Sequence, residues 1–549
     1  MLPGKMMERP LSVAAILDYA ADVHGDRVIL SRRVEGDTHS QDIATTRNRV
    51  KRLANALRAM GIRPGDRVAT LAWNGYRHLE LYYAISGMGA VCHTINPRLF
   101  PAQIAWIANH AEDKALFFDA DLTGQVAGLL PDLPQGLQLV CLCDPGGVPP
   151  EAPQGTLGYE DLIAASDTGF DWPEIAETAA SGLCYTSGTT GNPKGALYSH
   201  RSTVLHALST VLAVPSSFGV GKRILPAVPL FHVNAWGLPF SALLSGTDLV
   251  MPGPKLDGDS LFALIEGEGV TSAWGVPTIW QGLIDAMRRH GRKPERLGSL
   301  LIGGSAVAEA QVRALEAEFG ISVIHGWGMT EMSPIGSVTR PRDDLPLEER
   351  IASKMAQGQR LFGVEMRIVA QDDQPGAQDG IAIGELATRG NSVVSGYYND
   401  DDASQKALDR DGWFRTGDVA RIASDSTMTI VDRTKDLIKS GGEWISSIDL
   451  ENAALSCPGV RQAAAVAMPD PKWGERPLLV VVADPGHPVT SAQITAHLAK
   501  SLAKWQIPGE IRFRDSLPLT ATGKISKLVL RTLLTEAEGH DNRPDRANP

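Results

Sequence analysis

Short apolar runs alternate with longer amphipathic stretches over the first two thirds of this 549-residue chain. The apolar runs predict buried strands over 67–72, 90–95, 115–118, 139–142, 272–276, 300–304 and 323–326. Helical periodicity lies between them, for instance over 79–88 and 308–319. A strand, a crossover helix and a second strand form a parallel pair, so the pattern predicts parallel sheets covered on both faces.

The pattern changes twice towards the C-terminus. After about residue 364, short strands with glycine turns, as at 365–369 and 384–388, predict an antiparallel subdomain. Beyond 432 the sequence predicts a small α+β domain, with helices over 447–456 and 491–502 and strands over 460–467 and 478–482. We therefore expect an α/β domain at 1–431, a connection at 432–437, a small mobile domain at 438–535 and a disordered tail at 536–549.

Composition excludes several classes of protein. The 43% hydrophobic and 21% charged residues are typical of a soluble globular chain. A net charge of -11 without clustered Lys or Arg argues against a nucleic-acid partner. Five scattered cysteines fit reduced thiols in the cytoplasm. No transmembrane segment is expected, and the apolar run at 11–17 predicts an amphipathic helix and not a signal peptide.

One loop, Tyr185-Thr186-Ser187-Gly188-Thr189-Thr190-Gly191-Asn192-Pro193-Lys194-Gly195, combines hydroxyls, glycines and a lysine. Glycine backbone N–H groups, hydroxyls and an ammonium group all bind phosphate oxygens. The order differs from a P-loop, because Pro193 precedes the lysine and Gly195 follows it. A flexible surface loop is also compatible with the composition alone. As a triphosphate site, its binding residues are Thr186, Ser187, Gly188, Thr189, Thr190 and Lys194.

Further segments follow this loop in order. They are Pro229-Leu230-Phe231-His232, Gly326-Trp327-Gly328-Met329-Thr330-Glu331, Gly396-Tyr397-Tyr398-Asn399, Arg415-Thr416-Gly417-Asp418, residues 432–446 and Pro518-Leu519-Thr520-Ala521-Thr522-Gly523-Lys524-Ile525. The set resembles the adenylate-forming superfamily of acyl-CoA synthetases, firefly luciferase and peptide-synthetase adenylation domains. It covers nearly the whole chain.

The resemblance implies an ATP-dependent carboxylate–CoA ligase with ATP, Mg²⁺ and CoA as cofactor or co-substrates. A carboxylate attacks the α-phosphate of ATP and forms an acyl-adenylate and pyrophosphate, so the barrier is largely electrostatic. The resemblance assigns catalysis to Lys524, His232, Arg433 and Glu331, and Mg²⁺ contact to Thr189 and Glu331. It places Asp418 on the ribose hydroxyls. The remaining nucleotide contacts would be Gly303, Gly304, Ser305, His325, Gly326, Trp327, Gly328, Met329, Thr330, Ile430 and Arg433.

The second step needs a thiol to reach the adenylate, and the family rotates its small domain about one hinge residue. Lys435 matches that position. Asp432 stands where relatives often have glycine. The residues that would bind CoA are Lys439, Ser440, Gly441, Gly442 and Trp444. The resemblance further implies a homodimer.

The acid pocket would be bounded by His232, Val233, Trp236, Gly303, Met332 and Pro334. The segment 231–237 resembles medium- and long-chain fatty acyl-CoA synthetases, and also ligases for 3-methylmercaptopropionate, a short thioether acid. We expect a medium- to long-chain fatty acid, with the thioether acid as the second candidate. The sequence also leaves open a luciferase-like monooxygenase, an enzyme that loads a carrier protein, and a nucleotide-binding scaffold without catalysis.

Overall fold

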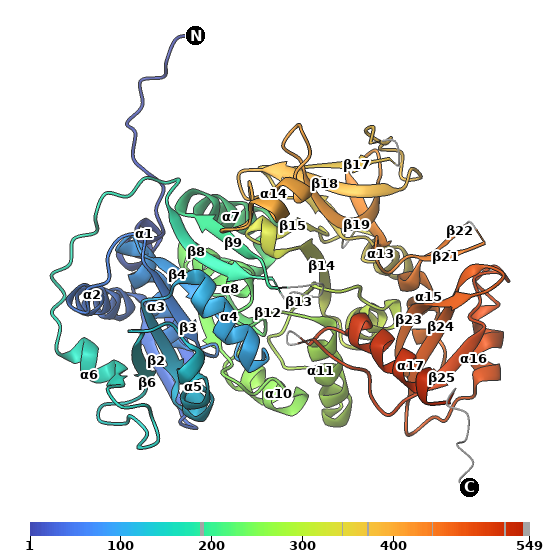
Figure 1. Ribbon diagram of the computed structural model, residues 1–549, viewed down its shortest axis with the longest axis horizontal. Helices are drawn as coiled ribbons and strands as arrows, with labels where there is room; N and C mark the ends of the chain where they lie inside the picture. The colour runs from blue at the N-terminus through green and yellow to red at the C-terminus, as the bar shows by residue number, and fades with distance from the viewer. Residues whose placement is uncertain (187–191, 343, 371–372, 442, 521–522, 542–549) are drawn as a thin grey trace, which may run out of the picture.

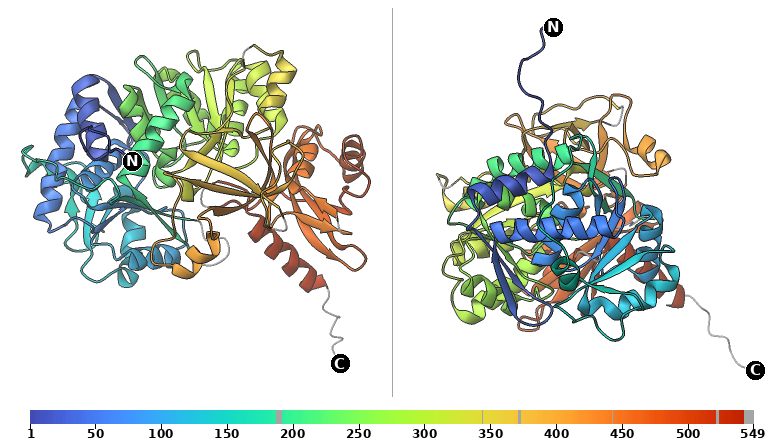
Figure 2. Two further views of the ribbon diagram at one scale, coloured as in Figure 1. Left: turned by 90° about the horizontal axis from the view of Figure 1, so that it is seen from above. Right: turned by 90° about the vertical axis from the view of Figure 1, so that its left-hand side faces the viewer.

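The computed structural model describes residues 1–186, 192–342, 344–370, 373–441, 443–520 and 523–541. Figure 1 and the left view of Figure 2 show a large domain with a smaller C-terminal domain at one end. Every strand predicted from the apolar runs is present, within a few residues of its expected bounds. The fold class, a large α/β domain followed by a small α+β domain, is confirmed.

The first sheet of the large domain is parallel except at one edge, where β8 and β9 are antiparallel and flank the Thr/Gly loop. Its order is β7 (Leu157–Gly158), β6 (Gln138–Leu142), β5 (Ala115–Asp119), β3 (Arg67–Leu71), β4 (Val91–Thr94), β8 (Ala180–Tyr185) and β9 (Gly195–Ser199).

The second sheet is parallel from β1 to β14 and then continues as antiparallel strands. The predicted antiparallel subdomain is therefore an extension of a parallel sheet. Its order is β2 (Thr38–Asp42), β1 (Val28–Arg32), β11 (Asp248–Met251), β10 (Arg223–Pro226), β12 (Ser272–Gly275), β13 (Ser299–Ile302), β14 (Ser322–Gly328), β15 (Ile335–Val338), β16 (Gly358–Arg360), β20 (Thr427–Arg433), β19 (Phe414–Ile422), β18 (Gly384–Gly390) and β17 (Val364–Val369).

The two sheets are joined by an apolar core in which α3 (Tyr76–Gly87) is buried along its whole length. The core draws side chains from both sheets, including Phe117 of β5 and Trp274 of β12. Such a core holds the loops at the ends of the strands in fixed positions. The other large-domain helices are α1 (Val13–Val23), α2 (Ile43–Ala59), α4 (Pro101–Ala111), α5 (Thr123–Leu129), α6 (Tyr159–Ala164), α7 (His200–Ala213), α8 (Val233–Trp236), α9 (Leu238–Ser245), α10 (Gly258–Gly267), α11 (Pro277–His290), α12 (Glu309–Arg313), α13 (Leu347–Ser353) and α14 (Asp401–Ala407).

The C-terminal domain has its own sheet and apolar clusters. The sheet order is β22 (Glu443–Ile445), β21 (Ile438–Ser440), β24 (Gly474–Ala483) and β23 (Val460–Asp470), with β25 (Glu510–Phe513) parallel to β24. Its helices are α15 (Ser447–Leu455), α16 (Ser491–Leu498) and α17 (Lys527–Asp541).

Several expected bounds differ from the structure, for instance that of β24, which starts four residues before its predicted start. The helix predicted over 308–319 is α12 followed by a π-helical turn, Ala314–Glu318. Helix α16 stops at Leu498, four residues before its predicted end. Helix α17 continues to Asp541, so 536–541 is helical and not a disordered tail, and 542–549 lies outside the described residues. Within the described residues, no helix combines the length and apolar character needed to cross a membrane.

Candidate active site

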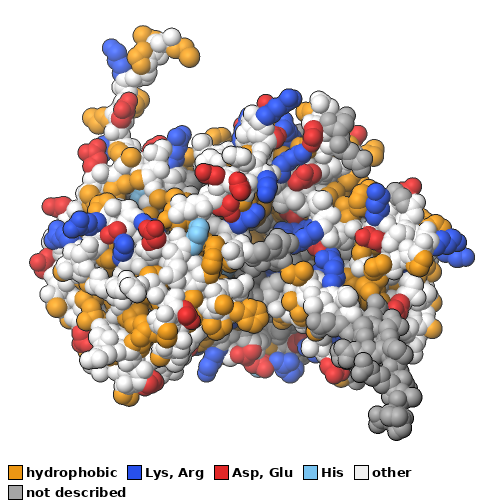
Figure 3. Space-filling model, in the orientation of Figure 1, with side chains coloured by type: hydrophobic (Ala, Val, Ile, Leu, Met, Phe, Trp, Pro, Cys, Tyr) orange, Lys and Arg blue, Asp and Glu red, His pale blue; other side chains and the backbone are white. Residues whose placement is uncertain are grey.

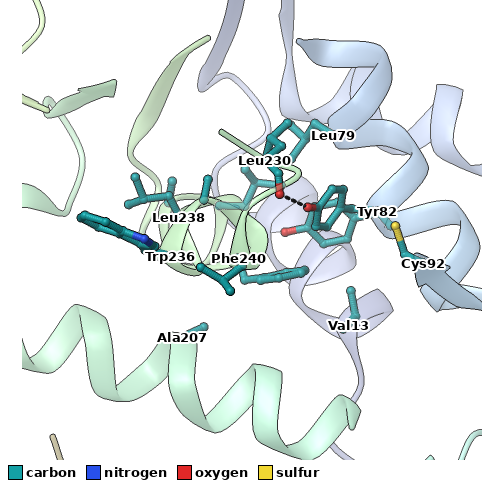
Figure 4. Close-up of a cluster of buried hydrophobic side chains, with 14 of the residues drawn as sticks. Val13, Leu79, Tyr82, Cys92, Ala207, Leu230, Trp236, Leu238 and Phe240 are labelled. Atoms are coloured by element: carbon teal, nitrogen blue, oxygen red, sulfur yellow. Dashed lines mark hydrogen bonds between the residues drawn. The ribbon is translucent and has the colours of Figure 1, made fainter. Parts of the chain in front are cut away.

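The segment that leads to His232 leaves β10 as irregular backbone and is held by one buried amide. Asn74 donates from Nδ2 to the carbonyls of Pro226 (2.8 Å) and Val228 (2.9 Å), while its Oδ1 accepts from Leu230 N (2.6 Å). The Tyr82 hydroxyl donates to the Leu230 carbonyl at 2.6 Å (Figure 4). Satisfied backbone groups fix the position of His232, because buried unpaired ones are costly.

The next four residues form a left-handed turn. The φ angles of Val233, Asn234, Ala235 and Trp236 lie between +43° and +58°, and Gly237 follows at +80°. Residues other than glycine rarely adopt this conformation, and each such residue costs about 1–3 kcal/mol, so the surrounding packing has to hold it. Backbone strain of this kind concentrates at functional sites.

The left-handed turn places the buried indole of Trp236 against Gly303, at the end of β13. A Cβ at Gly303 would lie 3.2 Å from the Trp236 ring and 2.9 Å from the Gly326 carbonyl oxygen. Three residues predicted from separate motifs are therefore in contact. Met332 and Trp327 both lie against Gly336, so the expected acid pocket and nucleotide site are neighbours.

The ends of the Thr/Gly loop are held together by main-chain and side-chain hydrogen bonds. Thr186 N donates to the Lys194 carbonyl (2.9 Å), and Lys194 N donates to Thr186 Oγ1 (3.1 Å). The Gly195 carbonyl accepts from Tyr398 N at 2.8 Å. The predicted contacts at Ser187, Gly188, Thr189 and Thr190 lie outside the described residues.

Glu331 lies in the short turn Thr330–Met332 and is almost fully buried. Its Oε1 accepts from the Tyr397 hydroxyl (2.8 Å), and Lys194 Nζ lies 4.9 Å above the Tyr397 ring. Burial raises the pKa of this carboxyl. Sequence reasoning missed Tyr397 as a site residue, although it belongs to the motif Gly396-Tyr397-Tyr398-Asn399.

A magnesium ion fits this carboxylate. The charged form of Glu331 is poorly solvated, and a hard cation favours oxygen ligands of this type. The described residues contain no cluster of three or more His, Cys, Asp or Glu side chains for a metal. At nucleotide sites Mg²⁺ is usually bound by one or two carboxylates together with substrate phosphates, and Glu331 could supply one such carboxylate.

Asp418 and Arg433 face each other across β19 and β20. Arg433 Nε donates to Asp418 Oδ1 (3.0 Å), and Trp327 Nε1 donates to Oδ2 (2.8 Å). A carboxylate oxygen can accept more than one hydrogen bond, so Asp418 retains capacity for two ribose hydroxyls. Two other expected nucleotide contacts lie in different surroundings. Ile430 N donates to Gln357 Oε1 (2.6 Å), whereas the side chain of Ser305 is exposed.

His325, one of the expected nucleotide contacts, has its ring bound within the large domain. Its Nδ1 donates to the Lys354 carbonyl at 2.8 Å, and its backbone N–H donates to Thr339 Oγ1 at 2.9 Å. Burial lowers its pKa to about 4, so the ring is neutral. The His325 carbonyl also accepts from Thr339 N (2.8 Å), so both the ring and the backbone of His325 are bound within the large domain.

Lys524 reaches the large domain from the C-terminal domain. Thr278 Oγ1 donates to the Gly523 carbonyl (3.0 Å), and a Cβ at Gly304, where φ is +81°, would lie 3.1 Å from Lys524 Cε. Burial and the charge of Arg433 lower the pKa of Lys524 to about 8. Burial and the charge of Lys524 lower the pKa of His232 to about 3. The site thus gathers two cations beside a neutral histidine, an arrangement that attracts anions.

The expected CoA residues lie elsewhere, on the hairpin β21–β22, which projects outward in Figure 1. Trp444 is half-exposed with Lys439 Nζ 5.4 Å above its ring, and Ser440 Oγ accepts from Arg476 (3.2 Å). Gly441 lies against the ring of Trp473, a residue that sequence reasoning missed. Gly442 lies outside the described residues.

Lys435 is exposed between the two domains, and the contacts beside it cross the expected hinge. Asp432 lies near the end of β20 in the large-domain sheet. Its buried carboxylate nevertheless accepts hydrogen bonds from N (2.6 Å) and Oγ (3.0 Å) of Ser447 in α15 of the small domain. The Ser446 hydroxyl donates to the Val431 carbonyl at 2.7 Å. Asp432 therefore binds the small domain in this conformation.

Comparison with known proteins defines the class. The model of the AMP-binding enzyme family matches residues 17–398, and that of the AMP-binding enzyme C-terminal domain matches 449–524. The chain belongs to the AMP-binding enzyme family, and it is an AMP-forming acid–thiol ligase.

Two full-length relatives are a medium-chain-fatty-acid–CoA ligase of Ectopseudomonas oleovorans and a 3-methylmercaptopropionyl-CoA ligase of Ruegeria lacuscaerulensis. The first is 45% identical over 96% of this chain and 97% of the relative; the second is 44% identical over 97% and 99%. The crystal structure of the anthranilate CoA ligase AuaEII with anthranoyl-AMP shares the fold, with a TM-score of 0.87 at 23% identity over 97% of this chain and 99% of that one.

The lowered pKa of Lys524 gives a prediction for the pH dependence of adenylate formation. A lysine is cationic below its pKa, so the charged fraction of Lys524 falls as pH rises through about 8. We expect kcat/KM for acid-dependent ATP–pyrophosphate exchange, measured without CoA, to fall over that range, since kcat/KM reports the free enzyme. Lys524→Arg keeps its charge and should lack this limb; the same limb in that variant would assign it to another group.

Proposed function

We propose that the chain activates a medium- to long-chain fatty acid, first as an acyl-adenylate and then as a CoA thioester. The observation that carries the first step is the position of Lys524, inserted against Gly304 beside Arg433 and His232. In adenylate formation the carboxylate and the α-phosphate are both negative. A partly buried site with two cations lowers the cost of bringing these two anions together.

Each neighbouring group has a role in this step. Lys524 would contact the carboxylate and α-phosphate oxygens as charge moves to the pentacoordinate phosphorus. Asp418 would hold the ribose, and Lys194 would neutralise the outer phosphates. Glu331 would hold Mg²⁺, which when bound neutralises phosphate charge and orients the leaving pyrophosphate. The neutral His232 adds no further positive charge and would face the carboxylate.

Thioester formation would follow rotation of the small domain about Lys435. Two exposed aromatic rings lie beside lysines on this side of the small domain. Trp444 of the hairpin β21–β22 lies below Lys439, and Trp473, between β23 and β24, lies 4.7 Å from Lys472 Nζ. Rings and cations of this kind suit the adenine and phosphates of CoA. In the present conformation these residues lie away from the site, while Lys524 occupies it.

The acid would enter a pocket between the turn at 233–236 and the segment 330–335. Its walls are apolar, because Val233, Trp236 and Met332 are buried hydrophobic side chains. The contact of Trp236 with Gly303 would narrow this proposed pocket. That contact also favours the second candidate, a short thioether acid such as 3-methylmercaptopropionate, which one relative is named for.

The location of the enzyme and its assembly are further proposals. The five cysteines are free and buried, as expected of a reducing cytoplasm. Figure 3 shows positive and negative side chains interspersed over one face, without a large basic field. A homodimer remains a prediction from the family resemblance.

The proposed function is tested with the purified chain, ATP, Mg²⁺ and CoA, and a panel of acids from short thioether acids to palmitate. AMP release should depend on both acid and CoA and be highest for a medium- or long-chain acid. Highest activity with a thioether acid would select the second candidate. No acid-dependent release with any member would refute the proposal.

Replacing the lysine should separate the two half-reactions. Lys524→Ala removes the cation from adenylate formation, and we expect a loss of about 10²–10³-fold or more in kcat for pyrophosphate exchange. Transfer from a supplied acyl-adenylate to CoA should change little. Equal losses in both steps would contradict the assigned role.

Proline at the hinge should produce the reverse pattern. Lys435→Pro fixes φ at a position where rotation is expected, so thioester formation should fall while pyrophosphate exchange is retained. Lys435→Ala, which leaves φ free, serves as the control. A proline variant with normal thioester formation would show that the rotation occurs elsewhere.

Shortening the tryptophan should change the acid specificity. Trp236→Ala removes the ring that lies on Gly303. We expect the variant to prefer a longer acid, with kcat/KM rising about 10-fold for each added methylene that the enlarged pocket accepts. The KM for ATP should stay within about twofold, because Trp236 is proposed to contact only the acid. An unchanged chain-length profile would remove this residue from the pocket.

A further inference from the structure

The helix α7 lies beside the proposed acid pocket and carries a histidine that no motif singles out. His206 is buried, with an exposed fraction of 3%. Its Nε2 lies 3.0 Å from Ile335 N and accepts that hydrogen bond, so Nε2 carries no proton. Burial lowers the pKa of His206 to about 3, which keeps the ring neutral and this acceptor available.

The other side of the same ring lies against the left-handed turn. A Cβ at Gly237 would approach His206 Cε1 and Nδ1 to 2.8 Å, and Gly237 has φ of +80°. Glycine is therefore required here for both space and conformation. Gly237 N donates to the Asn234 carbonyl at 2.8 Å, which closes the turn that carries Trp236.

His206 therefore contacts the backbone beside both walls of the proposed pocket. Gly237 directly follows Trp236, and Ile335 directly follows Pro334. Helix α7 also packs on α9 and β15, and Ala207 lies below Trp236 and Phe240 in Figure 4. One imidazole spans the gap between two segments that are 98 residues apart in sequence (335 minus 237).

We propose that His206 is a positioning residue that sets the separation of the two walls of the acid pocket, and hence the chain length of acid that fits. The role rests on the proposed function. The strained turn has its own conformational cost, and a wall that costs energy to hold needs a fixed partner. Without the His206 contacts, the turn and the segment 332–335 can separate, and the pocket loses its defined depth.

The test compares substitutions at two histidines on one helix. His206→Leu keeps a similar volume but removes the acceptor. His206→Gln retains an acceptor near the position of Nε2, while His206→Asn is too short to reach Ile335 N. The matched control is His200→Leu, because buried His200 also accepts a backbone hydrogen bond, from Val13 N at 3.1 Å, and Val13 lies in α1, outside both walls.

The readouts are kcat and KM for each acid in ATP–pyrophosphate exchange, the KM for ATP, and Tm. For His206→Leu we expect the KM for the acid to rise about 10-fold or more. We also compare kcat/KM for the best acid with kcat/KM for an acid that is longer by two methylenes, and we expect this ratio to fall towards one. The KM for ATP should stay within about twofold. His206→Gln should retain most of the ratio and His206→Asn should lose it. His200→Leu should lower Tm without changing the ratio.

Two outcomes would overturn this role. One is an unchanged chain-length ratio in His206→Leu or, if that variant does not fold, equal ratios in His206→Gln and His206→Asn. The other is a change in His200→Leu as large as that at His206, which would make the effect one of general stability. Absence of exchange by the unsubstituted enzyme with every acid would instead refute the proposed function, and the role of His206 with it.

Discussion

The site depends on one poorly solvated cation that is supplied by a different domain from the groups around it. Among the described residues, no carboxylate forms an ion pair with Lys524, while Arg433 adds positive charge nearby and Asp418 is occupied by Arg433 and Trp327. An ammonium group that is desolvated and incompletely compensated is unfavourable in the free enzyme. On the proposed function, that cost is removed when the phosphates and the carboxylate bind, so the charge is worth most when the reacting anions are present.

The large domain contributes a neutral histidine beside Lys524 and a fixed backbone segment that carries it. His232 has its pKa lowered to about 3, so it adds no third cation. Its position is fixed by Asn74, which forms hydrogen bonds with three backbone groups of the segment that leads to His232. The helix α3 that follows Asn74 is buried throughout, and its Tyr82 binds the same segment. Preorganisation of this kind avoids reorganisation during the reaction.

The helices and strands could be predicted from the sequence, because apolar periodicity is a local property. The motifs could be found as well, because each is a short continuous segment. The pairing of Asp418 with Arg433 follows from adjacent strands, and the contact of Trp236 with Gly303 agrees with the predicted pocket. Three features could not be predicted. The ring of His325 points to Lys354, Tyr397 binds Glu331, and His206 joins two distant segments. Each depends on which surfaces meet in the folded chain, and no local pattern encodes that.

On the proposed function, the small domain would have to leave its present position after the first step, and its contacts with the large domain are compatible with that. Thr278 to Gly523 and Ser446 to Val431 are single hydrogen bonds, each worth about 0.5–1.5 kcal/mol net. The buried carboxylate of Asp432 is different, since rotation that separates it from Ser447 leaves a charge in need of water. Rotation about Lys435 would break these two hydrogen bonds, so the contact between Asp432 and Ser447 favours the present conformation. On the proposed function, formation of the adenylate would convert the charged carboxylate into a mixed anhydride and let pyrophosphate leave. Less negative charge would then remain around Lys524, and the balance would move towards release of the small domain. The charges that assist the first step would thus also influence when the second can begin.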